Sequence, residues 1–72
     1  MEASDLQHPP FRVLTFRDGQ QVIAEDVETE VAARVRFASA VDLCKTRDDA
    51  HDHHVELHAG PKVLDRWSSA DV

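Results

Sequence analysis

The sequence predicts a single α+β domain of ββαββ order, in which one helix packs on a mostly antiparallel sheet. Three observations lead to this prediction. Two extended runs flank Asp18-Gly19, a stretch without Gly or Pro follows at 28–45, and a second extended pair is divided by Gly60-Pro61. One helix on one sheet is the economical packing because each layer then has one apolar face to bury. The chain has 72 residues, which allows one domain.

We expect the domain itself to cover residues 11–67. Residues 1–10 end in Pro9-Pro10, which cannot donate ladder hydrogen bonds and which favour extended, solvated backbone. These residues are therefore predicted to form a flexible N-terminal arm, and residues 68–72 are predicted to form a frayed tail.

Residues 11–16 and 21–27 are predicted to be the two strands of a β-hairpin. Both runs are rich in apolar and β-branched residues, and Asp18-Gly19 between them suits a type I′ turn, which needs positive φ at both central residues. If these two residues form the loop, Leu14 lies opposite Ile23. In the same register Arg12 lies opposite Glu25, and this opposite-charge pair across the strands supports the register.

Residues 28–45 are predicted to be an α-helix, because the stretch has no Gly or Pro and is rich in alanine. Acidic residues gather at its start and Lys45 lies at its end, as the helix dipole favours. Asp26 is the expected N-cap, with Thr29 as the competitor. Helical spacing predicts that the face meeting the sheet consists of Val27, Val31, Val35 and Ala38, with Phe37 and Val41 at its flank.

Residues 53–59 and 62–67 are predicted to be the last two strands. Side chains of 53–59 alternate between the core and solvent. The solvent-facing side, called the wet side below, carries His54, Glu56 and His58. Gly60-Pro61 indicates a turn between the two strands but leaves their register open. Trp67 ends the last strand, where it either seals the core or serves as an aromatic anchor for a partner.

The charge balance restricts the kind of partner. The chain carries 14 acidic against 8 basic residues, a formal net charge of −6, and has no cluster of Lys and Arg interleaved with aromatics. Because phosphate neutralisation supplies most of the non-specific affinity for nucleic acids, direct nucleic-acid binding is not expected. An acidic surface instead suits a basic protein, or imitates phosphate toward a protein that handles nucleic acids.

The cysteine count and the length bear on compartment and stability. Cys44 is the only cysteine, so no disulfide can form within one chain, and no run is apolar enough to span a membrane. No signal peptide is visible, and we expect the protein to lie in the cytoplasm without membrane contact. A chain of this length builds a thin core, so a protein partner or a second copy is expected to add stability.

Four of the five histidines fall within eight residues, beside several carboxylates. Imidazole with carboxylate suits Zn²⁺ and other divalent ions, so one alternative function is metal binding by the His/Asp cluster at 48–58. The ligands would then be His51, His53, His54 and His58. No recognised ligand spacing is present, however, and the main prediction includes no metal or other cofactor. The same histidines titrate near neutral pH, which offers pH sensing as a further alternative.

Catalysis is not expected. Cys44 with His51 or His54 offers a nucleophile and a base, but the sequence has no glycine-rich loop to hold an oxyanion or a phosphate. A cysteine at the end of a helix also faces the negative end of the dipole, which disfavours the thiolate. We therefore expect no enzyme activity and no catalytic residues.

The function predicted from these features is that of a small acidic module for protein–protein interaction. Such a module would act as an inhibitor or adaptor on a basic, nucleic-acid-handling partner, or it would associate with a second copy of itself. Anti-defence proteins of phages and mobile elements supply the analogy for the inhibitor. The expected partner-binding residues combine the acidic connector, the wet side of the third strand and the last aromatic residue, and they are Asp48, Asp49, Asp52, His54, Glu56, His58 and Trp67.

Overall fold

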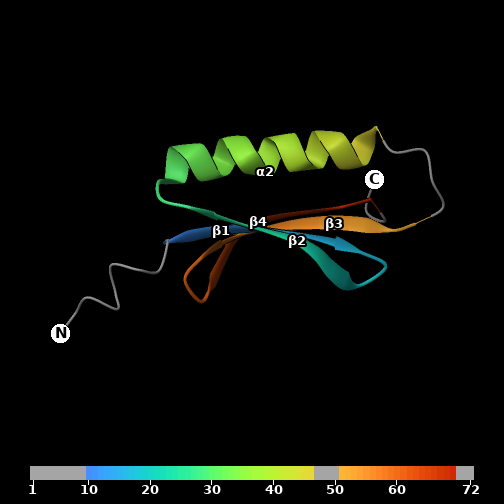
Figure 1. Ribbon diagram of the computed structural model, residues 1–72, viewed down its shortest axis with the longest axis horizontal. Helices are drawn as coiled ribbons and strands as arrows, with labels where there is room; N and C mark the ends of the chain where they lie inside the picture. Colours follow the sequence, from blue (N-terminus) through green and yellow to red (C-terminus); the bar gives the residue numbers. More distant parts are fainter. Residues whose placement is uncertain (1–9, 47–50, 70–72) are drawn as a thin grey trace.

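The computed structural model describes residues 10–46 and 51–69, which form four strands and one helix in the predicted ββαββ order (Figure 1). The elements are β1 (Phe11–Arg17), β2 (Gln20–Val27), α2 (Glu30–Lys45), β3 (His53–Ala59) and β4 (Lys62–Ser68). All neighbouring strands are antiparallel, in the order β2-β1-β3-β4, and α2 covers one face of the sheet. The predicted α+β fold is confirmed. Most of the predicted N-terminal arm and tail lies outside the described residues, although β4 extends to Ser68, one residue into the predicted tail.

The first hairpin has the predicted turn but a different register. Asp18 and Gly19 have φ values of 52° and 85°, both positive as a type I′ turn requires. The register shifts by one residue between Thr15 and Phe16, because a β-bulge adds Val22 to the returning strand. The predicted partners beyond the bulge are therefore wrong, and Arg12 pairs with Asp26 instead of Glu25. The expected type of charge pair is kept, with 2.8 Å between Arg12 Nε and Asp26 Oδ1.

The second hairpin repeats this arrangement. Gly60, at a φ of 59°, and Pro61 form its turn, and the register again shifts two pairs beyond the turn. The extra residue in the returning strand is Leu64, three positions after the turn, just as Val22 is in the first hairpin. The central strands β1 and β3 join the two hairpins, with Leu14 opposite Glu56 at the middle of their pairing.

The core lies between α2 and the sheet. Val13, Val55 and Leu57 are the largest fully buried side chains, and all three belong to the central strands β1 and β3. The rest of the buried cluster consists of Val27, Ala33, Val41 and Cys44. Trp67 lies opposite Val55 and is half-buried against this cluster, so it contributes to the core. The core is thin, as expected for a domain of this size.

The helix begins after Thr29, whose side-chain oxygen accepts a hydrogen bond from the Ala32 N–H (3.2 Å), so Thr29 and not Asp26 is the N-cap. Of the residues predicted to face the sheet, Val27 is buried but belongs to β2, and the prediction is wrong for Val31, Val35 and Ala38. Val31 and Val35 are 77% and 60% exposed, and the buried side consists of Ala33, Val41 and Cys44, with Phe37 packed beside them. Apolar residues lie on every side of this helix, so spacing alone permits more than one core-facing side.

Candidate interaction surface

A groove runs between α2 and β2. The helix packs mainly over β3 and β1 and makes few contacts with β2, so the helix-facing side of this edge strand stays open. The resulting cavity has a volume of about 480 Å³. It is lined by Thr15, Arg17, Val22, Ile23, Glu25, Arg36, Ser39, Ala40, Leu43, Cys44 and His53.

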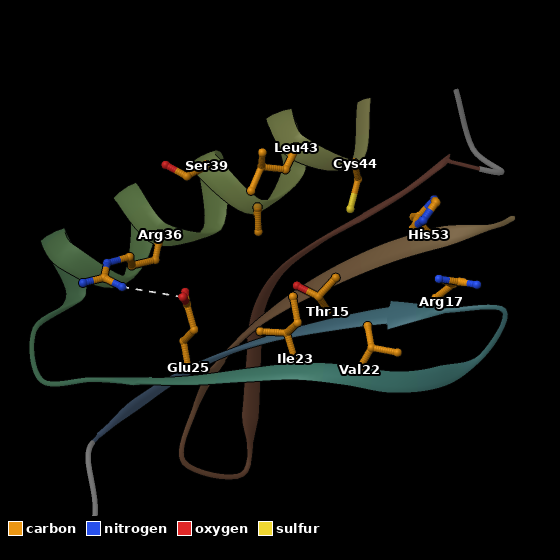
Figure 2. A pocket seen from close by; sticks show the side chains of 11 residues that line it. Thr15, Arg17, Val22, Ile23, Glu25, Arg36, Ser39, Leu43, Cys44 and His53 are labelled. Carbon is orange, nitrogen blue, oxygen red and sulfur yellow. Dashed lines mark ion pairs between the residues drawn. The ribbon is translucent and has the colours of Figure 1, made fainter. Parts of the chain in front are cut away.

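The middle of the groove is apolar. Figure 2 shows Val22 and Ile23 rising from β2 toward the helix, where Leu43 lies on the opposite wall. These three side chains are half-exposed or more, although each is large and aliphatic. Val22 reaches this side of the sheet because it is the extra residue of the bulge. Contiguous exposed apolar side chains beside a cavity are typical of a binding surface.

Charged and polar groups mark the two ends of the groove. At one end an ion pair joins α2 to β2, with 3.6 Å between Arg36 Nη1 and Glu25 Oε2 (Figure 2). At the other end lie Arg17 and His53, beside the thiol of Cys44. The arrangement suits a ligand segment with an apolar middle and polar ends.

A second cluster lies on the opposite, uncovered face of the sheet. His58 Nε2 donates a hydrogen bond to Glu56 Oε1 (2.7 Å), and His54 Nε2 lies 3.1 Å from Glu56 Oε2. The hydrogen bond from His58, aided by the charge of His54, lowers the pKa of the Glu56 carboxyl, and burial opposes this shift only in part. Phe16 stacks on His54, with ring centroids 4.2 Å apart. All these partners belong to the chain itself, so the cluster is internally satisfied.

The residues before β3 are attached to the first turn. The Asp18 N–H donates to the Asp52 carbonyl (2.8 Å), and the Asp52 N–H donates to Asp18 Oδ1 (2.9 Å). His51 Nδ1 lies 2.6 Å from Asp18 Oδ2. The backbone hydrogen bond from Asp52 lowers the pKa of the Asp18 carboxyl most, and His51 lowers it further. Asp18 therefore links the β1–β2 turn to the start of β3.

The predicted partner-binding residues do not form one surface. His54, Glu56 and His58 come together on the uncovered face, whereas Trp67 lies on the helix-facing side. Asp52 is exposed beside the first turn. Asp48 and Asp49 lie outside the described residues.

The four histidines of the metal alternative are also dispersed. His53 is buried on the helix-facing side, His54 and His58 lie on the other face, and His51 contacts Asp18. Within residues 10–46 and 51–69, no group of three His, Cys, Asp or Glu side chains is placed to hold a metal ion. Alternation along β3 explains the separation, because neighbouring side chains in a strand point to opposite faces.

Sequence reasoning missed the groove residues Val22, Ile23 and Leu43. The sequence predicts a strand at Ile23, but the exposure of this side chain depends on β2 being an edge strand and on the helix lying over β1 and β3. Both facts depend on contacts between residues far apart in the chain. The one signal of the groove in the sequence is that residues 28–45 carry apolar side chains on several sides of the helix. A helix of this kind has apolar surface that a single sheet does not bury.

A scan against protein-family models and searches of curated proteins and of solved structures found no match for this chain. Among the residues that the structure describes, no helix is both long enough and apolar enough to cross a membrane.

Proposed function

We propose that this chain is a non-enzymatic protein-interaction module of the cytoplasm that binds a partner through the groove between α2 and β2. One observation carries the proposal. Of the six large hydrophobic side chains that are exposed within residues 10–46 and 51–69, three line this groove, and they are Val22, Ile23 and Leu43. Binding of a partner to such an apolar surface removes it from water, which lowers the free energy of the complex.

The groove supports a particular mode of binding. β2 is an edge strand, so its outer backbone groups are available to an extended segment of a partner. Apolar side chains of such a segment would enter the cavity between Ile23 and Leu43. Main-chain hydrogen bonds would then supply affinity, and the shape of the groove would supply selectivity.

The charge distribution favours apolar contact over phosphate mimicry. Residues 10–46 and 51–69 contain nine acidic and seven basic side chains, so the described part of the chain is nearly neutral. Arg12, Arg34 and Arg36 each pair with a carboxylate of the chain itself. An inhibitor that offers carboxylates to a basic partner would depend more on Asp48 and Asp49, which lie outside the described residues.

The test compares two substitutions of exposed aliphatic residues. Leu43→Asp places a charge on the groove wall, and Val63→Asp places the same charge on β4, away from the groove. A partner captured from the native host with the wild-type chain is identified, purified and titrated against each variant by calorimetry. We expect Leu43→Asp to weaken binding by about tenfold or more, because a buried charge replaces an apolar contact, while Val63→Asp binds like the wild type.

Equal affinity of the wild type and Leu43→Asp for the purified partner would refute the groove as the binding surface. The acidic-inhibitor alternative predicts a different pattern. In that case binding would weaken steeply with salt and with charge reversal at Asp48, Asp49 and Asp52, while Leu43→Asp would have no effect.

A further inference from the structure

The two edges of the sheet differ in their chemistry. β4 carries Lys62 and Arg66 within seven residues, besides Asp65, which lies 4.0 Å from Arg34 of α2. Basic side chains spread along an edge strand discourage the addition of another strand. β2 instead begins with five uncharged residues, Gln20–Ala24, and Ile23 among them is 50% exposed. Each edge has one bulge, so the bulges do not distinguish them. The edge that favours strand addition is therefore β2.

The two charges on β2 do not protect this edge. Glu25 pairs with Arg36 of α2, and Asp26 pairs with Arg12 of β1, at 3.6 Å and 2.8 Å. Both carboxylates are thus partly compensated within the chain, and both lie at one end of the strand. The rest of β2 is left as an uncharged and partly apolar edge.

We infer that the partner of the β2 edge is a second copy of this chain, whose β2 pairs antiparallel to the first about a two-fold axis through Ile23. This inference rests on the proposed function, since it names an occupant for part of the same surface. The two Ile23 side chains then pack against each other on the helix-facing side of a continuous sheet. Val22 is the extra residue of the bulge and has no opposite partner, so Gln20 of each copy lies opposite Glu25 of the other. The amide of Gln20 then donates a hydrogen bond to the carboxylate of Glu25.

Charge and polarity select this register over its neighbours. The two copies must keep the same faces aligned, so the axis passes through a residue and not between two. Near the middle of Gln20–Val27 the candidates are Ile23, Ala24 and Glu25. An axis through Glu25 sets two like charges directly opposite each other, which is unfavourable. An axis through Ala24 sets Ile23 of each copy opposite a carboxylate and leaves the isoleucine without an apolar neighbour. Of these three axes, only the one through Ile23 places an apolar side chain opposite an apolar one and an amide opposite a carboxylate.

The thin core gives the second copy a stabilising role. The fully buried large side chains are Val13, Val55 and Leu57, and the only cysteine cannot form a disulfide within the chain. Domains of this size usually need a staple or an added interface. Pairing two β2 strands buries Ile23 of both copies and satisfies backbone groups along both edges.

The oligomeric state of the full chain is the first test. Sedimentation equilibrium from micromolar to millimolar concentration should give a mass that rises toward twice 8.1 kDa. Ile23→Lys should raise the dimer dissociation constant by about tenfold or more, because the axis brings the two new charges together. Val63→Lys is the matched control, since Val63 is 47% exposed on the other edge, and it should leave the dimer intact. Circular dichroism is used to check that each variant is folded.

A cross-link tests the register even if Ile23→Lys does not fold. Both cysteine variants are made in a Cys44→Ala background, because Cys44 lines the same groove as Ile23. Ile23→Cys should form a disulfide-linked dimer on mild oxidation. Gln20→Cys should not, because the two copies of residue 20 would lie about 13 Å apart along the strands, beyond the roughly 7 Å limit for a disulfide.

The outcomes separate this inference from the proposed function. A mass of 8.1 kDa at every concentration, or equal weakening by Ile23→Lys and Val63→Lys, overturns the second copy as the occupant of β2. The proposed function is tested separately, by the affinity of the Leu43→Asp variant for a purified partner. Efficient cross-linking of Gln20→Cys without cross-linking of Ile23→Cys likewise overturns the inferred axis.

Discussion

Arg36 of α2 and Glu25 of β2 form an ion pair of 3.6 Å that closes one end of the groove. Both side chains are substantially exposed, at 57% and 40%. On the other flank of the helix, Arg34 lies 4.0 Å from Asp65 of β4. Charged pairs thus link the helix to both edge strands, although α2 packs mainly on the two central strands.

We expect the Arg36–Glu25 pair to contribute little to stability. Exposed ion pairs are screened by water and lose side-chain entropy, so their coupling energies are usually below about 1 kcal/mol. A double-mutant cycle with Arg36→Met and Glu25→Gln, measured by urea denaturation, should give a coupling of this size that decreases with added salt. A coupling of about 2 kcal/mol or more that is insensitive to salt would contradict this expectation and would indicate a pair shielded from water.

The turn of the first hairpin should depend on Gly19. Its φ of 85° is a conformation that L side chains rarely adopt, and a Cβ added there meets nothing within 4 Å. The cost of Gly19→Ala is therefore a backbone cost, expected to be about 1–2 kcal/mol in the free energy of unfolding. Gly19→Asn is the comparison, because asparagine tolerates positive φ better than alanine and should lose less. Equal losses in the two variants would show that something other than backbone conformation is responsible.

Thr29 should be required for the start of the helix. Its hydroxyl oxygen accepts the Ala32 N–H at 3.2 Å, which satisfies one of the first amide groups of α2. Thr29→Ala is expected to cost about 1 kcal/mol, and Thr29→Ser, which keeps the hydroxyl, should cost less. Chemical denaturation of both variants measures the difference. If the serine variant were as unstable as the alanine variant, the capping bond would not be the cause.

The features of the fold that the sequence predicts correctly depend on residues close together in the chain. Asp18-Gly19 specifies its turn because few residues accept positive φ, and alternation along 53–59 assigns His54 and Val55 to opposite faces before any contact is known. The alanine-rich stretch 28–45, which lacks Gly and Pro, likewise predicts the helix from its own composition. Each of these features depends on residues within one turn or one strand.

The features that were missed depend on contacts between distant residues. The bulge at Val22 shifts the partner of Arg12 from Glu25 to Asp26, and no local pattern signals it. The exposed position of Ile23 follows from the strand order, in which β3 pairs with β1 and leaves β2 at the edge. The groove therefore could not be predicted from the sequence, because its two walls come together only in the folded chain.

The same reasoning applies to the histidines. Their closeness in sequence suggested a shared metal site, but a strand places His53 and His54 on opposite faces of the sheet. Only His54 and His58 remain on one face, and both contact the carboxylate of Glu56, which lies between them. The two histidines therefore act on the carboxylate of Glu56.

Glu56 should make the stability of the domain depend on acidic pH. The pKa of its carboxyl lies below the ordinary value of 4.5, first because His58 donates a hydrogen bond to it and then because His54 lies nearby. The unfolded chain therefore binds more protons than the folded chain between these two pKa values, so stability rises with pH across that range. The contribution is fully present above pH 4.5 and is lost as the pH falls through the folded-state value.

Glu56→Gln removes this titration while keeping a side chain of similar size. We expect the wild type to lose stability as the pH falls below about 4.5, and the variant to lose less over the same range, as measured by urea denaturation midpoints. The Asp18 carboxyl, whose pKa is lowered by the backbone N–H of Asp52, supplies part of the remaining slope. Adding Asp18→Asn should therefore flatten the profile further. Parallel profiles for the wild type and Glu56→Gln would mean that the histidines do not stabilise the ionised carboxylate in the folded state.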